Sequence, residues 1–337
     1  TRTRSRTRAF ARLSTPSRNR ESKSDRPRAV FFGTGSFGVE TLWDLDMSDD
    51  VDLVGVVTAP PRPAGRKLEL RASPIGQEAD GCVGVKTILT PDRLRDREAI
   101  DSVLALRPDI AILADYGQLV PAPILDLPLG ALNLHPSLLP RHRGATPIPA
   151  TILAGDKETG VTLIQMDRGL DTGPIVAQAR VPLRGSETTP ELQEILKARA
   201  DSLLQASLGP WIRGELKAVP QDESGATLTG RLTRDDGRLG PDIPALQAWR
   251  MVRAYLPWPG TFIETPSGRL VVLAGSVVDS APGDVPGRLV AEGDGLALAT
   301  TAGRLRLERV QPAGGRPMSG GAFLRGRGRD LVGRNLV

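Results

Sequence analysis

Apolar positions along this 337-residue chain follow two different periods. After residue 28, short runs of branched and aromatic side chains are separated by stretches in which apolar residues recur at helical spacing. The short runs predict buried strands, because they are too brief for helices and rich in valine, isoleucine, leucine and phenylalanine. These predicted strands cover residues 29–32, 53–57, 110–113 and 132–134.

Helical spacing occurs between these strands, over Val39–Leu45 and Arg97–Leu106, and Pro91-Asp92 is typical of a helix start. Strands and helices that alternate along a chain indicate a parallel sheet with helices on both faces. The expected class is therefore α/β, with a Rossmann-like parallel sheet. Ligands of such sheets bind at the carboxyl ends of the strands.

A long helix is predicted after Val181. Its start signature is Ser186–Glu191, with Pro190 in the first turn, and it can continue to about Arg213. Its apolar residues have the spacing of a helix that faces a core. They are Leu192, Ile195, Leu196, Leu203 and Leu204.

The pattern changes again toward the C-terminus. Runs rich in valine and leucine at 270–273, 296–299 and 305–307 are punctuated by glycine, which predicts a small β barrel. Residues 214–244 carry scattered Gly, Asp and Pro, which is typical of a linker. The expected organisation is a tail over 1–28, a first domain over 29–213, the linker over 214–244 and a second domain over 245–337.

The formal net charge of +5 is distributed unevenly. Residues 1–28 and 245–337 have an excess of Lys and Arg, whereas residues 29–244 have an excess of Asp and Glu. The C-terminal part is therefore the better candidate for contact with a polyanion such as a nucleic acid.

Residues 1–28 are rich in Arg, Ser and Thr and poor in apolar side chains, so we expect a disordered basic tail. Two interpretations of this tail stay open. One is an incidental solvated extension of a bacterial protein, which the preference for Arg over Lys along the chain favours. The other is an organellar transit peptide, which has a similar composition and would place the protein in an organelle matrix.

Composition also bears on the compartment. Cys82 is the only cysteine, which excludes a disulfide framework and suits a reducing compartment such as the cytoplasm. No apolar run reaches the roughly 18 residues that a membrane-spanning helix needs. We therefore expect a cytoplasmic protein with no membrane partner.

Both histidines of the chain lie in one short stretch, Asn133–Gly144. The preceding residues are typical of the end of a buried strand, which Pro136 stops. Asn133 and His135 are two residues apart on that strand, so their side chains leave it on the same face. An amide that can donate to an oxyanion therefore lies next to a titratable imidazole.

A glycine-rich loop, Met166–Gly173, directly follows the strand-like run 161–165. This loop can bring a carboxylate to the same edge of the sheet. An Asn, a His and an Asp that converge there suit acyl transfer to an amine, which needs a base, an oxyanion donor and a group that orients the imidazole. The arrangement alone does not name the substrate.

At these residues the chain resembles the formyltransferases that use 10-formyltetrahydrofolate. The family motif Asn-x-His-x-Ser-Leu-Leu-Pro occupies Asn133–Pro140, and the motif Leu-Asp-Thr-Gly occupies Leu170–Gly173. The ordered match covers about residues 29–337 and is similar to the branch that acts on methionyl-tRNA. Further matching segments are Phe31–Thr34, Arg62–Arg66, Ala154–Thr162, Pro257–Gly260 and Gln311–Gly315.

The resemblance implies that Asn133, His135 and Asp171 form the catalytic trio of a formyltransferase domain. It leaves open whether His135 or Asp171 is the formal base. It also implies that 10-formyltetrahydrofolate is the co-substrate, bound at the edge of the sheet. Residues expected to contact the folate or the substrate are Tyr116, Gly117, Ser137, Leu138, Leu139, Pro140, Asp167, Gly169, Thr172 and Gly173.

The same resemblance implies a monomer whose partner is initiator methionyl-tRNA. The tRNA would contact the proline-rich loop 59–67 and an OB-like C-terminal domain. Expected tRNA contacts are Arg62, Arg66, Lys67, Arg304, Arg306 and Arg316. The alternative for the loop is a surface turn with solvated arginines, and some of the C-terminal arginines could be solvated as well.

Several other patterns point elsewhere and are weaker. Gly33–Gly38 fits a dinucleotide-binding fingerprint, but the second predicted strand ends without the acidic residue that binds a ribose, so a tight turn is favoured. Ser137 is not expected to be a nucleophile, since the formyl donor is already activated. His142 is interpreted as a structural or substrate-side contact. No metal is expected, because one cysteine and two histidines do not match usual ligand spacings.

Three rival functions remain. A formyltransferase for a small amine, such as a nucleotide sugar, would share the trio but lack the Arg66 loop and the basic C-terminal domain. A noncatalytic RNA-binding module would not need the intact trio. A folate hydrolase would transfer the formyl group to water instead of an amine.

Overall fold

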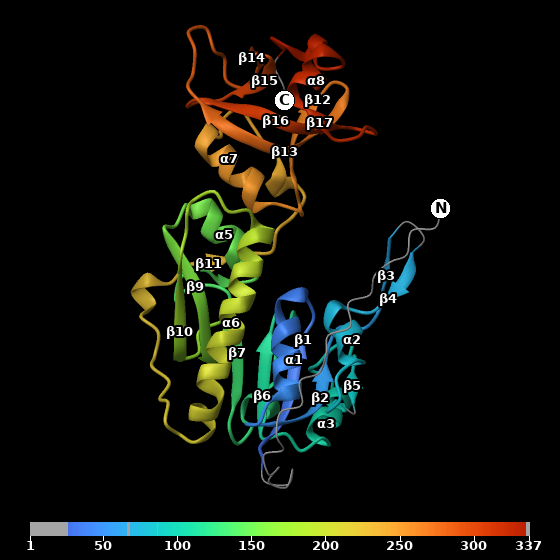
Figure 1. Cartoon of the computed structure of the whole chain (residues 1–337), viewed down its shortest axis with the longest axis vertical. Helices are drawn as coiled ribbons and strands as arrows, with labels where there is room; N and C mark the ends of the chain where they lie inside the picture. Colours follow the sequence, from blue (N-terminus) through green and yellow to red (C-terminus); the bar gives the residue numbers. More distant parts are fainter. Residues whose placement is uncertain (1–25, 66–67, 86, 335–337) are drawn as a thin grey trace, which may run out of the picture.

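The computed structural model describes residues 26–65, 68–85 and 87–334. Most of the expected disordered tail lies outside these residues, as do Arg66 and Lys67. Within the described part, two large β sheets with their helices are stacked along the long axis of the molecule (Figure 1), and two further sheets have two strands each. The expected boundaries at residues 28, 213 and 244 stay a prediction.

The N-terminal sheet has seven strands in the order β10-β9-β7-β6-β1-β2-β5. The part from β7 to β5 is parallel, which confirms the predicted α/β class. One edge of the sheet is not parallel, which the alternation did not predict, because β9 runs antiparallel to both β7 and β10. The strands are β1 (Arg28–Gly33), β2 (Asp52–Val57), β5 (Ile88–Leu89), β6 (Ile110–Ala114), β7 (Ala131–His135), β9 (Glu158–Gln165) and β10 (Ile175–Pro182).

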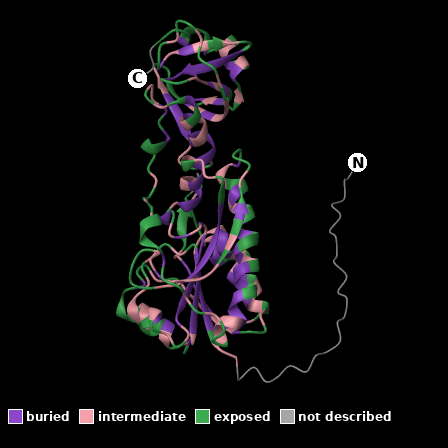
Figure 2. Cartoon of the chain, turned by 90° about the vertical axis from the view of Figure 1, so that its left-hand side faces the viewer, coloured by how far each residue is buried: buried purple, intermediate pink, exposed green. Residues whose placement is uncertain are grey.

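Helices cover both faces of this sheet, as the alternation predicted. Residues of α1 and α6 share one buried cluster with Phe31, Ile112 and Leu134, and residues of α3 and α4 share another with Phe32 and Leu113. Buried residues follow the sheets, and exposed residues line the outer helix faces (Figure 2). The helices are α1 (Val39–Met47), preceded by the short η1 (Ser36–Gly38), α2 (Pro74–Ala79), α3 (Arg97–Leu104), α4 (Ala122–Leu125), α5 (Pro147–Ala154) and α6 (Thr189–Ile212).

The expected helix start at Pro91-Asp92 is wrong, because α3 begins at Arg97 with Asp96 as its N-cap residue. The side chain of Gln118 accounts for the difference. Its amide donates to the Pro91 carbonyl oxygen at 3.1 Å and accepts the Leu94 N–H at 2.7 Å. These two bonds hold the backbone before α3 in a nonhelical course.

The long helix α6 begins where its sequence signature places it. The Thr188 hydroxyl accepts the Glu191 N–H, and the Glu191 carboxylate accepts the Thr188 N–H, which forms a complete capping box. Of the expected core residues, Leu192, Leu196, Leu203 and Leu204 are buried, whereas Ile195 is 39% exposed. Ile195 was therefore wrongly assigned to the core, since its position on the helix turns it away from the sheet.

The segment expected to be a linker returns to the N-terminal sheet side before it reaches the C-terminal domain. Its strand β11 (Leu228–Thr229) pairs in parallel with β8 (Arg143–Gly144), at the end of the stretch that contains both histidines. The short turns η2 (Glu223–Gly225) and η3 (Asp235–Gly237) flank this pairing. The segment is thus packed on the region that carries the candidate chemistry.

The C-terminal domain is an antiparallel β domain, in agreement with the predicted strands at its valine-rich runs. Its sheet follows the order β12-β13-β16-β15-β14, with β17 paired to β16. The elements are α7 (Ala245–Ala254), β12 (Thr261–Thr265), β13 (Gly268–Val278), β14 (Leu289–Glu292), β15 (Gly295–Ala299), β16 (Arg304–Pro312), β17 (Met318–Ser319), α8 (Gly320–Arg325) and η4 (Arg329–Leu331).

Helix α7 joins the two domains, and it lies directly above α5 in Figure 1. The Thr189 hydroxyl at the start of α6 donates to the Ala254 carbonyl oxygen at 2.6 Å. Arg253 donates to the Glu187 carbonyl oxygen at 2.8 Å and stacks on the Trp249 ring at 3.9 Å. The two hydrogen bonds attach the C-terminal domain to the start of α6, and the stack on Trp249 holds the Arg253 side chain within α7.

A small hairpin of β3 (Arg62–Ala64) and β4 (Glu69–Arg71) projects away from the N-terminal sheet (Figure 1). Its first strand, β3, lies in the proline-rich loop 59–67, in which tRNA contacts are expected. None of the helices in the described part of the chain is long and apolar enough to cross a membrane.

Candidate active site

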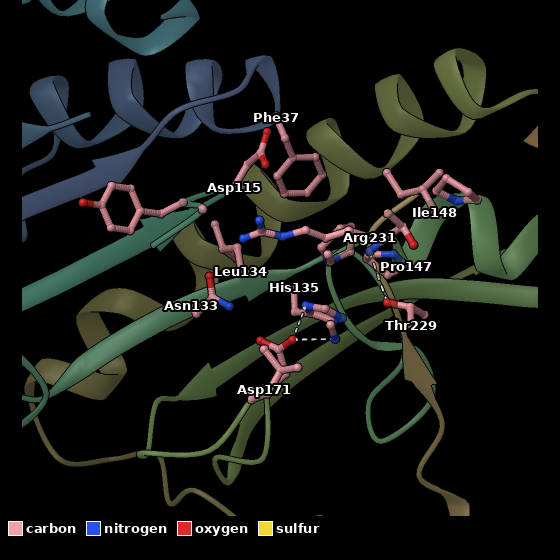
Figure 3. Close-up of a pocket in the computed structure, with 18 of the residues that line it drawn as sticks. Phe37, Asp115, Asn133, Leu134, His135, Pro147, Ile148, Asp171, Thr229 and Arg231 are labelled. Carbon is pink, nitrogen blue, oxygen red and sulfur yellow. Dashed lines mark hydrogen bonds and ion pairs between the residues drawn. The ribbon is translucent and has the colours of Figure 1, made fainter. Parts of the chain in front are cut away.

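A cavity of about 670 Å³ lies at the carboxyl ends of β6 and β7 (Figure 3). This is the place where a parallel sheet is expected to bind its ligand. Residues from η1, α5, α6, the loop after β9 and the segment after β11 complete its wall. They include Phe37, Asp115, Tyr116, Gly117, Asn133, His135, Pro147, Ile148, Leu170, Asp171, Thr189, Gln193, Thr229 and Arg231.

Strand β7 delivers two of the expected catalytic residues. Asn133 and His135 line the cavity with their side chains on one face of β7, and Leu134 between them is buried in the core and also contributes to the lining. This is the outcome that the two-residue period of a strand predicts. Asn133 presents its amide to the cavity without a hydrogen bond to any described residue. It is therefore free to donate to a substrate oxygen.

The ring of His135 is 4% exposed and held by a backbone group. Its Nε2 lies 2.9 Å from the His142 carbonyl oxygen. Because a carbonyl oxygen only accepts hydrogen bonds, Nε2 carries a proton and Nδ1 is the nitrogen that can gain one. Burial lowers the pKa of His135, although the nearby Asp171 carboxylate raises it in part. The ring is therefore neutral near pH 7 and can act as a base at Nδ1.

Asp171 lies beside His135, with its Oδ2 atom 3.6 Å from Nδ1. This distance is longer than a hydrogen bond, so the contact is one between charges when the ring is protonated, and the expectation that Asp171 orients the ring stays a prediction. The His142 carbonyl provides an orienting hydrogen bond to the ring. Asp171 is placed as a charge partner, which can stabilise the imidazolium once Nδ1 has taken a proton.

The route by which Asp171 reaches His135 differs from the expected one. Because β9 is antiparallel to β7, its last residue Gln165 lies beside Leu132, at the start of β7. The loop after β9 must therefore fold back along the sheet. Asp171 adopts a left-handed φ of 53°, which an aspartate tolerates better than most residues, and its Oδ2 accepts the Gly144 N–H at 2.7 Å.

His142 has a structural role in the turn after β7, which agrees with one of its two interpretations. Its φ is 60°, and its Nε2 donates to the Asp156 carboxylate at 2.7 Å. Its N–H donates to the Thr227 hydroxyl at 2.7 Å. Both contacts hold the carbonyl that binds His135.

Of the residues expected to contact folate or substrate, Tyr116 and Gly117 line the cavity. Residues 137–140 are not among the residues that line it. The Ser137 hydroxyl is buried and donates to the Arg141 carbonyl oxygen at 2.6 Å. Thr162 and Gln178 hold the backbone of Leu139. Direct ligand contacts by Ser137, Leu138, Leu139 and Pro140 stay a prediction.

The loop after β9 is held partly by its own side chains. The Asp167 carboxylate accepts the Gly169 N–H at 2.9 Å and the Thr172 hydroxyl at 2.7 Å. Gly173 lies so close to the Gln165 carbonyl oxygen that a Cβ would be 2.0 Å from it. These residues shape the loop that carries Asp171, and ligand contacts of their own stay a prediction.

The arginines expected to bind tRNA differ in their surroundings. Arg62 and Arg316 are exposed, and Arg306 is half-exposed and pairs with Asp294 at 3.2 Å. The Arg304 side chain is only 12% exposed and pairs with both Asp284 and Glu292. Its guanidinium is thus already neutralised, which makes it the weakest candidate of this set for a phosphate contact.

Two residues of the cavity wall have chemistry that the sequence did not reveal. Asp115 directly follows β6 and has a φ of 54°. Desolvation inside the cavity raises the pKa of its carboxyl group to about 6, although part of the residue stays exposed. Arg231 extends from the segment after β11 toward the side of the cavity that Asp115 lines (Figure 3). The sequence does not predict a role for Asp115 or Arg231, because the fold, and not their spacing in the sequence, brings them to the cavity of the catalytic trio.

The dinucleotide-like turn is explained by packing. A Cβ at Gly35 would lie 1.7 Å from the Asp115 carboxylate, and one at Gly33 would lie 3.0 Å from the Ala114 carbonyl oxygen. These glycines therefore permit close approach of β1 and β6.

Within the described residues, no group of three or more His, Cys, Asp or Glu side chains could hold a metal ion.

Fold and site together are those of a formyl transferase. Residues 27–208 match the family model described as formyl transferase, and residues 231–328 match the model of the formyl transferase C-terminal domain. The methionyl-tRNA formyltransferase of Roseiflexus sp. (strain RS-1) is 43% identical over 302 residues, which are 89% of this chain and 92% of the relative. The chain belongs to the methionyl-tRNA formyltransferase family.

Solved structures with the same fold include a HypX from Aquifex aeolicus in complex with tetrahydrofolic acid, at a TM-score of 0.59 and 16% identity. The match covers 90% of this chain and 48% of HypX, so the chain spans about half of that protein. WlaRD, a sugar 3N-formyl transferase, has a TM-score of 0.60 and 16% identity, with coverage of 84% and 98%. At these identities the likeness concerns the fold.

Proposed function

We propose that this protein transfers the formyl group of 10-formyltetrahydrofolate to the α-amino group of methionyl-initiator tRNA. The product is N-formylmethionyl-tRNA, which serves translation initiation. The observation that carries the proposal is the meeting of Asn133, His135 and Asp171 at one cavity, in a chain whose relatives over most of its length are methionyl-tRNA formyltransferases.

In the proposed reaction, the amine attacks the formyl carbon and a new C–N bond forms. His135 accepts the proton of the amine at Nδ1, the nitrogen left free by the bond to His142. Asn133 donates its amide N–H to the oxygen that becomes negative. Asp171 stabilises the imidazolium, which then returns its proton to N10 of the folate as the bond from the formyl carbon to N10 breaks. Tetrahydrofolate leaves, and atoms and charges balance.

For the folate, we propose binding at the backbone of Tyr116 and Gly117 and at the loop Asp167–Gly173, beside the trio. For the tRNA, we propose contacts by Arg62, Arg66, Lys67, Arg306 and Arg316, with Arg304 in a supporting place. The exposed hairpin of β3 and β4 and the basic excess of residues 245–337 support this assignment. We also propose that the protein acts as a monomer in the cytoplasm.

A small amine such as a nucleotide sugar is the second candidate substrate. The fold that the chain shares with WlaRD favours it, since that protein is a sugar formyl transferase. The much higher identity to methionyl-tRNA formyltransferases favours tRNA.

The test incubates the purified protein with 10-formyltetrahydrofolate and charged initiator methionyl-tRNA, and measures N-formylmethionine after deacylation. We expect transfer by the wild type, loss in His135→Ala, and a defect in Arg66→Ala that depends on the tRNA concentration. Arg199→Ala, an exposed arginine on α6, is the matched control. Formyl transfer only to a small amine or to water would contradict the proposal.

A further inference from the structure

Gln221 connects the segment after α6 to the loop that carries Asp171. Its side-chain amide donates to the Asp171 carbonyl oxygen at 2.8 Å and to the Gly173 carbonyl oxygen at 2.7 Å. The residue is 9% exposed, so both bonds form away from competing water. Both N–H groups of the amide are thereby used on the backbone of one loop.

The other end of the same amide is held by Arg143. The Gln221 carbonyl oxygen accepts from Arg143 Nε at 3.1 Å and from a terminal guanidinium nitrogen at 2.8 Å. Because an arginine only donates, the amide cannot be flipped, and its N–H groups must face the loop. Arg143 is itself buried and makes two further bonds to the Glu223 carboxylate, at 2.9 and 2.7 Å.

The hydrogen bonds from Arg143 through Gln221 reach the loop after β9, and this loop depends on contacts from other segments to hold its conformation. Asp171 has a left-handed φ, and the antiparallel course of β9 requires the loop to fold back before Asp171 reaches His135. The Gly144 N–H fixes the Asp171 carboxylate, while Gln221 fixes the backbone on both sides of Thr172. Asp171 is therefore held at its side chain and at its main chain by two separate elements.

We propose that Gln221, oriented by Arg143, is a positioning residue for formyl transfer that keeps the Asp171 carboxylate beside His135. The inference rests on the catalytic role proposed above for Asp171. Displacement of a catalytic group by about 1 Å can cost on the order of 100-fold in rate. The segment after α6 thus contributes to catalysis, in addition to connecting the two domains.

The first test compares Gln221→Met and Gln221→Glu with wild type in the tRNA formylation assay. Met removes both sets of bonds at similar length, and Glu keeps an acceptor for Arg143 but has no N–H groups for the loop. We expect kcat to fall about tenfold to 100-fold in both variants, with KM for folate and for tRNA changed less than about twofold. Gln205→Met, on the exposed face of α6, is the matched control and should keep wild-type kinetics. A fall in Gln221→Met alone, or in neither variant, would overturn the role of the N–H groups.

A double-mutant cycle separates positioning from general support of the fold. If Gln221 acts through Asp171, Gln221→Met should cost less than about twofold more in a protein that already carries Asp171→Asn. Losses that multiply would overturn the proposal.

If Gln221→Met does not fold, Glu223→Ala tests the same series of hydrogen bonds from its exposed end, at the carboxylate that holds Arg143. A severalfold fall in kcat at constant KM would support the proposal, and wild-type kinetics would overturn it. A wild type that forms no N-formylmethionyl-tRNA would instead contradict the proposed function.

Discussion

At the residue scale, the activity depends on which nitrogen of His135 carries a proton. The bond from Nε2 to the His142 carbonyl reserves Nδ1 for the incoming proton, and burial lowers the pKa of the ring. A base must be unprotonated, so kcat/KM should rise with pH through the pKa of His135 and then level off. We expect this inflection below about 6.5, the ordinary value for histidine. A pH profile of kcat/KM measures it, and an inflection clearly above that value would contradict a neutral resting ring.

Asp171→Asn gives a second prediction at the same pair of residues. The Asp171 carboxylate raises the pKa of His135, so its replacement by a neutral amide should move the inflection to lower pH. The variant also loses the stabilisation of the imidazolium, and kcat should fall about 100-fold or more. A pH profile of kcat/KM checks the shift of the inflection, and kcat at saturating substrates checks the loss of rate. A shift toward higher pH would show that the carboxylate does not act through charge on His135.

The sequence indicates part of this site and misses the rest for physical reasons. The spacing of Asn133 and His135 predicts their common face, because side chains alternate along any strand. The bond from His135 to His142 depends on a left-handed turn at His142, which local spacing does not encode. Gln221 and Arg231 reach the site only after the segment beyond α6 has folded back, so no local motif includes them.

At the scale of elements, α6 connects the cavity to the C-terminal domain. Its first turns carry Thr189 and Gln193 to the cavity wall, and Thr189 also bonds to Ala254 of α7. The start of this helix therefore contributes both to the wall of the cavity and to the attachment of the C-terminal domain.

The capping box of α6 is open to a direct test. Thr188→Ala removes the hydroxyl that accepts the Glu191 N–H, and it should lower the free energy of unfolding by about 1 kcal/mol. Chemical denaturation with urea measures this change. Ser202→Ala, at an exposed position later in the same helix, serves as control and should change stability by less than about 0.5 kcal/mol. Equal effects of the two substitutions would mean that the box does not stabilise the helix.

The sequence predicts whether a segment forms a helix or a strand better than it predicts the direction of a strand or the strand with which it pairs. The apolar runs of β1, β2, β6 and β7 predict strands because each is short and buried. The antiparallel direction of β9 depends on its neighbour β10, and alternation is the same for either direction. The strand β11 has two residues, so its pairing with β8 cannot be recognised from a pattern of apolar positions.

At the scale of the whole molecule, α7 holds the C-terminal domain against the start of α6. Two hydrogen bonds make this joint, from Thr189 to the Ala254 carbonyl oxygen and from Arg253 to the Glu187 carbonyl oxygen. A domain held in this way can present a fixed set of cations to a large anionic ligand. The total charge of +5 says less about such a ligand than the uneven distribution of charge does.

The arginines proposed to contact tRNA divide into two groups by their surroundings, and salt dependence separates them. Arg62 and Arg316 are exposed, so Arg62→Ala and Arg316→Ala should raise KM for tRNA and leave the free energy of unfolding unchanged. Each should also reduce the slope of log kcat/KM against log salt by about one for every phosphate that the arginine neutralises. Arg304 is neutralised by Asp284 and Glu292, so Arg304→Ala should instead lower the free energy of unfolding and leave that slope nearly unchanged.

The measurements are formylation kinetics at several salt concentrations together with urea denaturation, and Arg199→Ala on α6 is the control for removal of an exposed arginine. A large drop in salt slope for Arg304→Ala, with stability intact, would mean that tRNA binding breaks its pairs with Asp284 and Glu292. In that case the C-terminal domain would exchange internal ion pairs for phosphate contacts when it binds. An unchanged slope for Arg62→Ala and Arg316→Ala would remove the β3–β4 hairpin and the loop between β16 and β17 from the tRNA interface.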